Sequence, residues 1–195
     1  MHISTRAGGF TLLELMIVIA LIAITLVIGV PSFQGVINSS RITAPANDLL
    51  AALQSARIEA VRTGRRTVVC RSDNPDAAAP ACAAVGGAWT GWVSFVDADG
   101  DGVLDAGERL LRVGAIEAPA QLLVSPNISG ASNQIVVRPD GMARTGAGAL
   151  LAARMRVCVP AALPAENARD VVITAGSRTA VQRASLAGAC PAPGN

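Results

Sequence analysis

The fold is decided by one stretch near the start of the chain, Gly8-Gly9-Phe10-Thr11-Leu12-Leu13-Glu14-Leu15-Met16-Ile17-Val18-Ile19-Ala20. It opens an apolar run from Phe10 to Val30 in which Glu14 is the only ionisable side chain. At about 1.5 Å of rise per residue, a helix over this run is roughly 30 Å long. The run therefore predicts a helix that crosses a membrane.

A short leader, Met1 to Gly9, precedes the apolar run and carries Arg6. Positive charge on this side predicts that the N-terminus stays in the cytoplasm and that the residues after Val30 lie across the membrane. An ordinary secretory signal has small residues after its apolar core, where a peptidase removes that core. Here the small pair, Gly8 and Gly9, comes first. A generic single-span anchor with an accidental acid is the alternative interpretation.

This order of residues resembles the type IV prepilin signature, in which Gly is followed by Phe-Thr-Leu-x-Glu. The resemblance implies cleavage between Gly9 and Phe10 by a prepilin peptidase, N-methylation of Phe10, and retention of the apolar helix in the mature protein. A carboxylate near the start of a membrane span is costly and rarely lacks a function. The partner that the resemblance implies for Glu14 is the N-terminal amine of Phe10 on a neighbouring subunit, a pairing that would set the register between subunits. An unpaired, protonated Glu14 is the alternative.

The composition indicates one domain of ordinary size beyond the span, within a chain of 195 residues. The net charge is only +2, which gives no general signal for a polyanionic partner. The only histidine, His2, lies in the leader, so a mature chain would have no His-dependent triad and no His-ligated zinc. We expect a structural protein that is not an enzyme and requires no cofactor.

A second helical half follows the apolar run, from Ser32 to Arg62. Its apolar residues recur at spacings of three and four and form one stripe suited to packing on a sheet. Pro45 interrupts this pattern, and we expect a break at residues 39–44 with Thr43 as the N-cap of the last segment. Gly64 then ends the helix.

The segment from Arg41 to Ala60 is similar to the GspH/FimT branch of the pilin-like proteins, in which an Asn-Asp-Leu, Leu-Gln and Ala-Arg-x-Glu-Ala run closes the helix. Pro31, after the apolar run, predicts a bend in a continuing helix. The resemblance implies the type IV pilin fold of the α+β class, a long kinked N-terminal helix packed on an antiparallel, β-rich head. The expected parts are a leader (1–9), a transmembrane half of the helix (10–30), its second half (31–64) and the head (65–195).

Short β-rich runs separated by Gly, Pro, Asn and Asp follow Gly64. A connection rich in Ala, Pro and Asp, from Ser72 to Ala88, is expected to lie on the surface, and Trp89 and Trp92 are expected in or beside the core. The predicted strands are Thr67 to Arg71, Gly91 to Val96, Arg109 to Val113, Gln121 to Ser125, Gln134 to Arg138, Arg154 to Val159, Asp170 to Thr174 and Arg178 to Arg183.

Four cysteines in an exported chain indicate two disulfides more readily than a metal site or a nucleophile. Proximity along the chain favours Cys70–Cys82 and Cys158–Cys190 over the two other connectivities.

An acidic stretch from Asp97 to Glu108 fits the EF-hand loop pattern D-x-D-x-D-G-x5-E over its full length. Its flanks have strand patterns, so a signalling pair of EF-hands is not expected. A structural calcium ion that stiffens a hairpin is one interpretation, and an acidic turn without an ion is the other. The calcium ligands would be Asp97, Asp99, Asp101, Val103, Asp105 and Glu108.

The C-terminal region is basic, with an excess of arginine over acids after Gln121. FimT-like proteins can bind DNA through a Gly-Arg-x-Arg motif on the last hairpin. The matching positions here are Gly176-Ser177-Arg178-Thr179, so both motif arginines are absent at their positions. Binding through Arg169, Arg178 and Arg183 is the alternative to an ordinary solvated edge.

These observations predict a minor pilin of a type IV pilus, which primes or joins the filament in support of twitching, adhesion or DNA uptake. The alternatives are a pseudopilin of a type II secretion system and a DNA-binding minor pilin for transformation. The expected partners are other pilins, the prepilin peptidase and methylase, and an inner-membrane assembly platform. We expect a single-pass inner-membrane protein with a periplasmic head that later enters a pilus or pseudopilus.

Overall fold

One long helix runs through the whole molecule. The computed structural model describes residues 9–145 and 148–195, with the backbone alone at 28 and 31; the leader residues 1–8 lie outside this range. Helix α1 (Leu12–Thr63) begins at Thr11, whose side chain caps the first turn, and ends at Gly64, where φ is +64°. A residue with a Cβ is strained in this left-handed conformation, so glycine suits the helix end.

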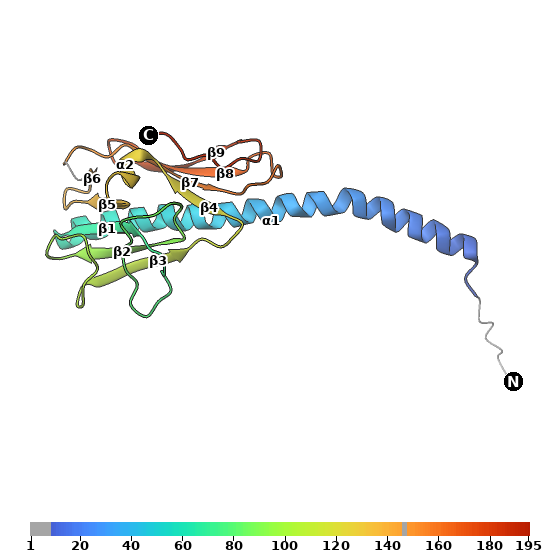
Figure 1. Cartoon of the computed structure of the whole chain (residues 1–195), viewed down its shortest axis with the longest axis horizontal. Helices are drawn as coiled ribbons and strands as arrows, with labels where there is room; N and C mark the ends of the chain where they lie inside the picture. The colour runs from blue at the N-terminus through green and yellow to red at the C-terminus, as the bar shows by residue number, and fades with distance from the viewer. Residues whose placement is uncertain (1–8, 146–147) are drawn as a thin grey trace.

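The predicted break before Pro45 is wrong. α1 continues without interruption through positions 31 and 45, and Thr43 lies inside it instead of capping a new segment. Proline in a helix removes one hydrogen bond and costs about 3 kcal/mol. The side chains of Ile42, Ala46 and Leu49, on both sides of Pro45, are fully buried against the head and offset this cost. In Figure 1 the helix bends in the half that lies outside the head, the half in which a bend at Pro31 was predicted.

Two antiparallel sheets make up the head and lie along the C-terminal half of α1 (Figure 1). The first has the order β3-β2-β1-β5-β6 and the second the order β4-β7-β8-β9. Each predicted strand corresponds to an observed one within two residues at either end, while β6 and the short helix α2 (Pro126–Ser129) were not predicted. The strands are β1 (Arg66–Arg71), β2 (Gly91–Asp97), β3 (Arg109–Ala115), β4 (Gln121–Val124), β5 (Gln134–Val137), β6 (Ala143–Arg144), β7 (Ala153–Cys158), β8 (Ala168–Ile173) and β9 (Thr179–Ala184).

The main core lies between α1 and the two sheets. Trp89 and Trp92 are both 1% exposed within or beside it, as predicted, and the Trp89 indole N–H donates to Asn133 Oδ1 at 3.2 Å. A smaller core covers the other face of the first sheet, where Val93 and Phe95 pack with Cys82 and other apolar side chains. For this reason β2 is buried along its whole length instead of alternating.

Both predicted disulfides are present. Cys70–Cys82 ties the surface connection after β1 to the smaller core, and Cys158–Cys190 ties the C-terminal tail to the end of β7. The Cα atoms are 5.6 Å and 5.8 Å apart, within the usual range for a bridge.

The ion pairs of Asp170 allow the stability of the second sheet to be tested. Its carboxylate is buried on β8 and accepts hydrogen bonds from Arg156 Nε at 2.7 Å and from Arg154 Nη1 at 3.3 Å. We expect Asp170→Asn to lower the free energy of unfolding by about 2 to 4 kcal/mol, because it leaves two partly buried guanidinium groups without their buried counter-ion. Urea unfolding of the full chain in a non-ionic detergent, followed by tryptophan fluorescence, measures this change.

Asp140→Asn is the matched control. Asp140 forms a similar ion pair with Arg144 at 2.7 Å, but its side chain is 45% exposed. Solvent screens such a pair, so the control should leave the unfolding midpoint nearly unchanged. Equal losses in the two variants would contradict the role assigned to Asp170.

Candidate functional site

The first turn of α1 holds the residues singled out by the sequence at the N-terminus. The Glu14 N–H donates to Thr11 Oγ1 at 3.1 Å, so Thr11 caps the helix on which Glu14 sits. This cap follows the pattern Thr-x-x-Glu, a signal in the sequence that our prediction did not use. Phe10, just before the helix, is 81% exposed. Among the described residues, the Glu14 carboxylate has no hydrogen-bond or ion-pair partner, and it faces outward one turn from Phe10.

The apolar half of α1 packs against no other part of the chain that the structure describes. The helix is long and apolar enough to cross a membrane, and none of its most apolar window is buried. Side chains along it are more than 40% exposed, for example Leu12 at 77% and Ile22 at 51%. Exposed apolar surface of this size requires a bilayer or other apolar helices around it.

A polar clamp that the sequence prediction missed joins α1 to the head. Glu59 is only 8% exposed, and it pairs with Arg62 of the next helical turn and with Arg109 at the start of β3. Nearer the start of α1, Asn38 Nδ2 donates to the Leu163 carbonyl of the head at 2.9 Å. Glu59 falls on the packed stripe, three residues after Ala56, and this acid at an apolar spacing was the signal that could have revealed it.

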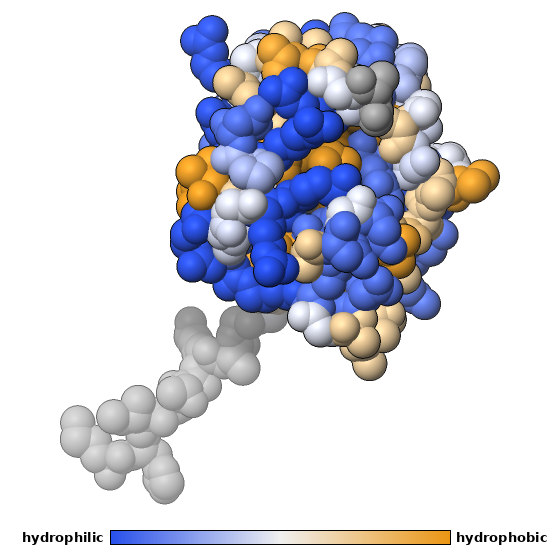
Figure 2. All heavy atoms as spheres, turned by 90° about the vertical axis from the view of Figure 1, so that its left-hand side faces the viewer, coloured by the Kyte–Doolittle hydropathy of each residue, from blue (hydrophilic) through white to orange (hydrophobic). Residues whose placement is uncertain are grey.

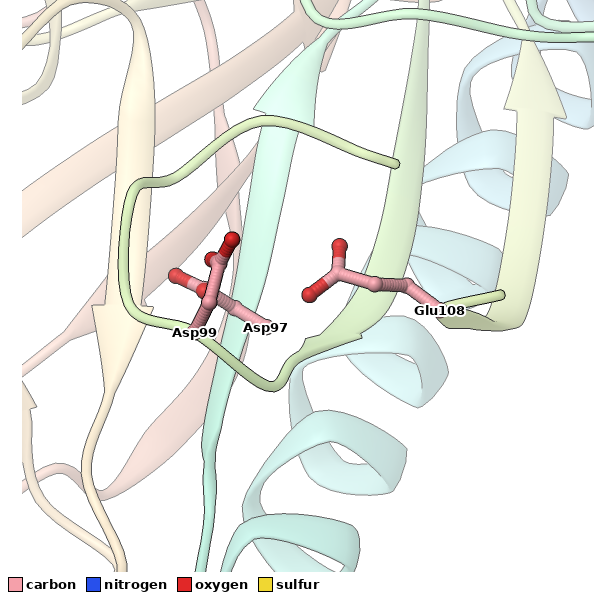
Figure 3. Close-up of side chains that lie close together, drawn as sticks. All are labelled: Asp97, Asp99 and Glu108. Carbon is pink, nitrogen blue, oxygen red and sulfur yellow. The ribbon is translucent and has the colours of Figure 1, made fainter. Parts of the chain in front are cut away.

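The acidic loop between β2 and β3 brings the predicted calcium ligands into two groups. Carboxylate oxygens of Asp97, Asp99 and Glu108 lie within 4.8 Å of one another, as do those of Asp99, Asp101 and Asp105. Figure 3 shows Asp97 and Asp99 close together, with Glu108 reaching toward them from the start of β3. The backbone of Val103, at the seventh loop position, lies in the same turn.

Groups of the protein itself already engage these carboxylates. Asp97 is 1% exposed and accepts from Arg66 Nε at 3.0 Å and from the Gly100 N–H at 2.7 Å. Glu108 accepts from the Ala98 N–H at 2.6 Å and so closes the base of the loop. A calcium ion would compete with Arg66 for Asp97, and binding of calcium stays a prediction.

The three arginines considered for DNA binding do not form one patch. Arg169 is buried at 5% exposure, and its guanidinium donates to backbone carbonyls of Glu166 and Ala168 and to Ser39 Oγ on α1. Burial, with a smaller contribution from Arg183, lowers the pKa of Arg169 below its ordinary value. The prediction of Arg169 as a contact for DNA is wrong, because its charged group serves the junction between helix and head.

Arg178 and Arg183 remain exposed but lie at opposite ends of β9. Arg178 precedes β9, while Arg183 is near its end and pairs with Glu166 at 3.3 Å. They are five positions apart, which is roughly 16 Å along an extended strand, so they cannot bind the same phosphate. Binding of DNA through these two side chains stays a prediction.

Two family models match the chain along different parts. A model described as prokaryotic N-terminal methylation motif matches residues 4–30, which include Gly9, Phe10 and Glu14. A model described as type II transport protein GspH matches residues 45–177, more than half of the chain and most of the head. The chain belongs to the GspH family. No curated protein sequence is similar enough to count as a match.

The likeness of this GspH-family chain to a solved type IV minor pilin supports the type IV pilin fold. The type IV minor pilin FimU of Pseudomonas aeruginosa superposes with a TM-score of 0.52 at 18% identity, over 74% of this chain and 90% of that one. The minor pseudopilin EpsH from the type 2 secretion system of Vibrio cholerae has a TM-score of 0.46 at 10% identity, over 74% and 97%.

Family membership confirms the class predicted from the sequence. This GspH-family protein is a pilin-like subunit, a structural protein and not an enzyme. Its methylation motif and apolar helix indicate a membrane-anchored subunit that is processed by a prepilin peptidase and assembles with other pilins.

The predicted calcium site can be tested by thermal unfolding of the full chain. We expect millimolar calcium to raise the Tm, because a bound cation would hold together acids that now repel one another. Glu108→Gln should remove the increase, since it takes away the carboxylate at the twelfth loop position. Magnesium is the control ion and should raise the Tm less than calcium, because it requires a stricter coordination geometry. An unchanged Tm would identify the loop as an acidic turn closed by Arg66 and its own backbone.

Proposed function

We propose that this chain is a minor pilin of a type IV pilus. The observation that carries the proposal is a fully exposed apolar half-helix, with Glu14 as its lone acid, joined rigidly to a folded head. Before assembly, this half-helix holds the protein in the inner membrane with the head on the periplasmic side. During assembly, it leaves the lipid and packs among the helices of other pilins.

Glu14 selects the position of the subunit in this packing. In an environment with little water, an unpaired carboxylate is strongly unfavourable, so Glu14 needs a cationic partner from outside its own chain. Cleavage after Gly9 would create such a cation, the amine of Phe10, at the start of each helix. Pairing of Glu14 with the Phe10 amine of a neighbour fixes the axial offset between two subunits, because a shift by one turn leaves both charges unpaired.

A pseudopilin of a type II secretion system is the second candidate. The description of the matching family model, a type II transport protein, favours it. In both systems the partners would be other pilin-like subunits, the prepilin peptidase and methylase, and an inner-membrane assembly platform. Deletion of the gene separates the two: loss of surface pili supports the first candidate, and loss of secreted proteins with intact pili supports the second.

Glu14→Ala tests the assembly role. We expect the variant to insert into the membrane normally, since the apolar run is unchanged, and to be absent from sheared filaments. The helix cap should survive, because the bond to Thr11 comes from the backbone N–H of residue 14. Immunoblots of membrane and filament fractions measure both outcomes.

Glu166→Ala provides the control for a general effect of losing an acid, since Glu166 is an exposed residue of the head. It should enter filaments as the unaltered protein does. Incorporation of Glu14→Ala at the normal level would contradict the proposed pairing.

Processing of the N-terminus gives a separate prediction. Mass spectrometry of the protein from membranes should find a chain that begins at Phe10 and carries one N-methyl group. The same measurement in a strain without the prepilin peptidase should find residues 1–9 still attached. A mature chain that retains Met1 in the normal strain would contradict the proposed function.

A further inference from the structure

A crevice opens between the two sheets at the end of the head, beside the C-terminal half of α1. Its volume is about 410 Å³, within the range of protein sites that bind small ligands or peptide ends. Figure 2 looks onto this end of the head and shows a hollow with an apolar floor and a hydrophilic rim. Neither the membrane anchor nor the acidic loop uses this crevice.

The helix α1 and both sheets contribute side chains to the floor of the crevice. Leu53 comes from α1, Ile135 and Val137 from β5, Ala143 from β6 and Ile173 from β8. Each of these aliphatic side chains is at most 4% exposed, so the floor is firmly packed. It is suited to an aliphatic group and offers no aromatic ring on which a nucleobase could stack.

Two arginines lie on the rim, Arg57 of α1 and Arg178 beside β9. Arg57 Nη1 donates to the Ser177 carbonyl at 3.0 Å, and the Ser177 hydroxyl accepts from the Ala143 N–H at 2.7 Å. The backbone of Gly141 also lies close, since a Cβ there would be 3.4 Å from Arg57 Nε. These contacts hold Arg57 in place, and because its hydrogen-bond partner is a neutral carbonyl, its positive charge is not neutralised.

The rim keeps its positive charge. No acidic residue lines the crevice. Within residues 9–145 and 148–195, neither Arg57 nor Arg178 forms an ion pair, whereas Arg144, Arg154 and Arg156 of the head all do. Guanidinium groups bind carboxylates with good geometry and strength. Charge and floor together therefore fit a ligand that is aliphatic at one end and anionic next to it.

We propose that this crevice binds the C-terminal end of a partner polypeptide whose last residue is aliphatic. The side chain of that residue lies on the floor, and its terminal carboxylate is bound by Arg57 and Arg178. A chain terminus fits better than a continuous strand, because a space of about 410 Å³ holds only a few residues and a chain end brings a carboxylate to the rim arginines. A terminal residue also offers an aliphatic group and a carboxylate within one residue.

The location favours a partner beyond the helical bundle. The crevice lies against the packed half of α1, away from the apolar half that neighbouring pilins would cover. The inference rests on the proposed function in one respect, namely that neighbouring pilins cover the apolar half of α1. Binding to the purified protein tests the crevice independently of which filament the chain enters.

The experiment uses the full chain in nanodiscs of phosphatidylcholine and fluorescein-labelled peptides Gly-Ser-Gly-Ser-X. X is Leu, Ile, Val, Ser or Lys, and each peptide is made with a free carboxylate and as an amide. Fluorescence anisotropy should show the free acids ending in Leu, Ile or Val binding about tenfold more tightly than their amides or than the Ser and Lys peptides.

Variants locate the binding. Arg57→Gln with Arg178→Gln should weaken it about tenfold or more, and Gln54→Trp should abolish it by filling the mouth, which Gln54 lines. Arg112→Gln is the matched control, because Arg112 is an exposed arginine on β3, at the opposite edge of the first sheet from β5 and β6, and does not line the crevice; it should have no effect.

Three results would overturn the proposal: equal binding of acids and amides, an equal loss with Arg112→Gln, or no peptide bound below about 1 mM. Displacement of the peptide by oligothymidine, with the same dependence on Arg57 and Arg178, would assign the rim to nucleic acid instead.

Discussion

The burial of one face of α1 is the constraint on which the structure depends. Ile42, Ala46, Leu49, Ala56 and Ala60 are fully buried, and three of these five are alanines. Small side chains let the two sheets approach the helix closely, so that a single helix supports both. The same packing carries the helix through Pro45 and holds Glu59 where Arg62 and Arg109 can reach it.

Local patterns in the sequence predicted much of this arrangement. The cap at Gly64, the strands and both disulfides depend on residues close together in the chain, and the structure confirms them. The continuity of α1 at Pro45 depends on the packed core of the head, and the burial of Arg169 includes a contact with Ser39, 130 positions away. Spacing alone cannot reveal such contacts, because they exist only once both sheets have packed on the helix.

The acidic loop and the basic hairpin show the same limit at the level of charge. The pattern from Asp97 to Glu108 identified the acids, but the position of Arg66 follows from the pairing of β1 with β2, which sets it opposite Asp97. The excess of arginine near the C-terminus was visible in the sequence, yet the fold divides these side chains among a buried junction, ion pairs and the crevice rim. Counting charges in the sequence therefore identified the acidic loop and the basic C-terminal region, and only the packing showed what each charged side chain contacts.

The uninterrupted course of α1 has a mechanical consequence. A helix with a flexible joint would let the head swivel while its anchor stayed fixed, but α1 has no break between Leu12 and Thr63. Rotation of the anchor about its own axis must then turn the head by a similar amount. A neighbour that fixes the angular position of Glu14 in a filament thereby also sets the direction in which the crevice at the far end faces.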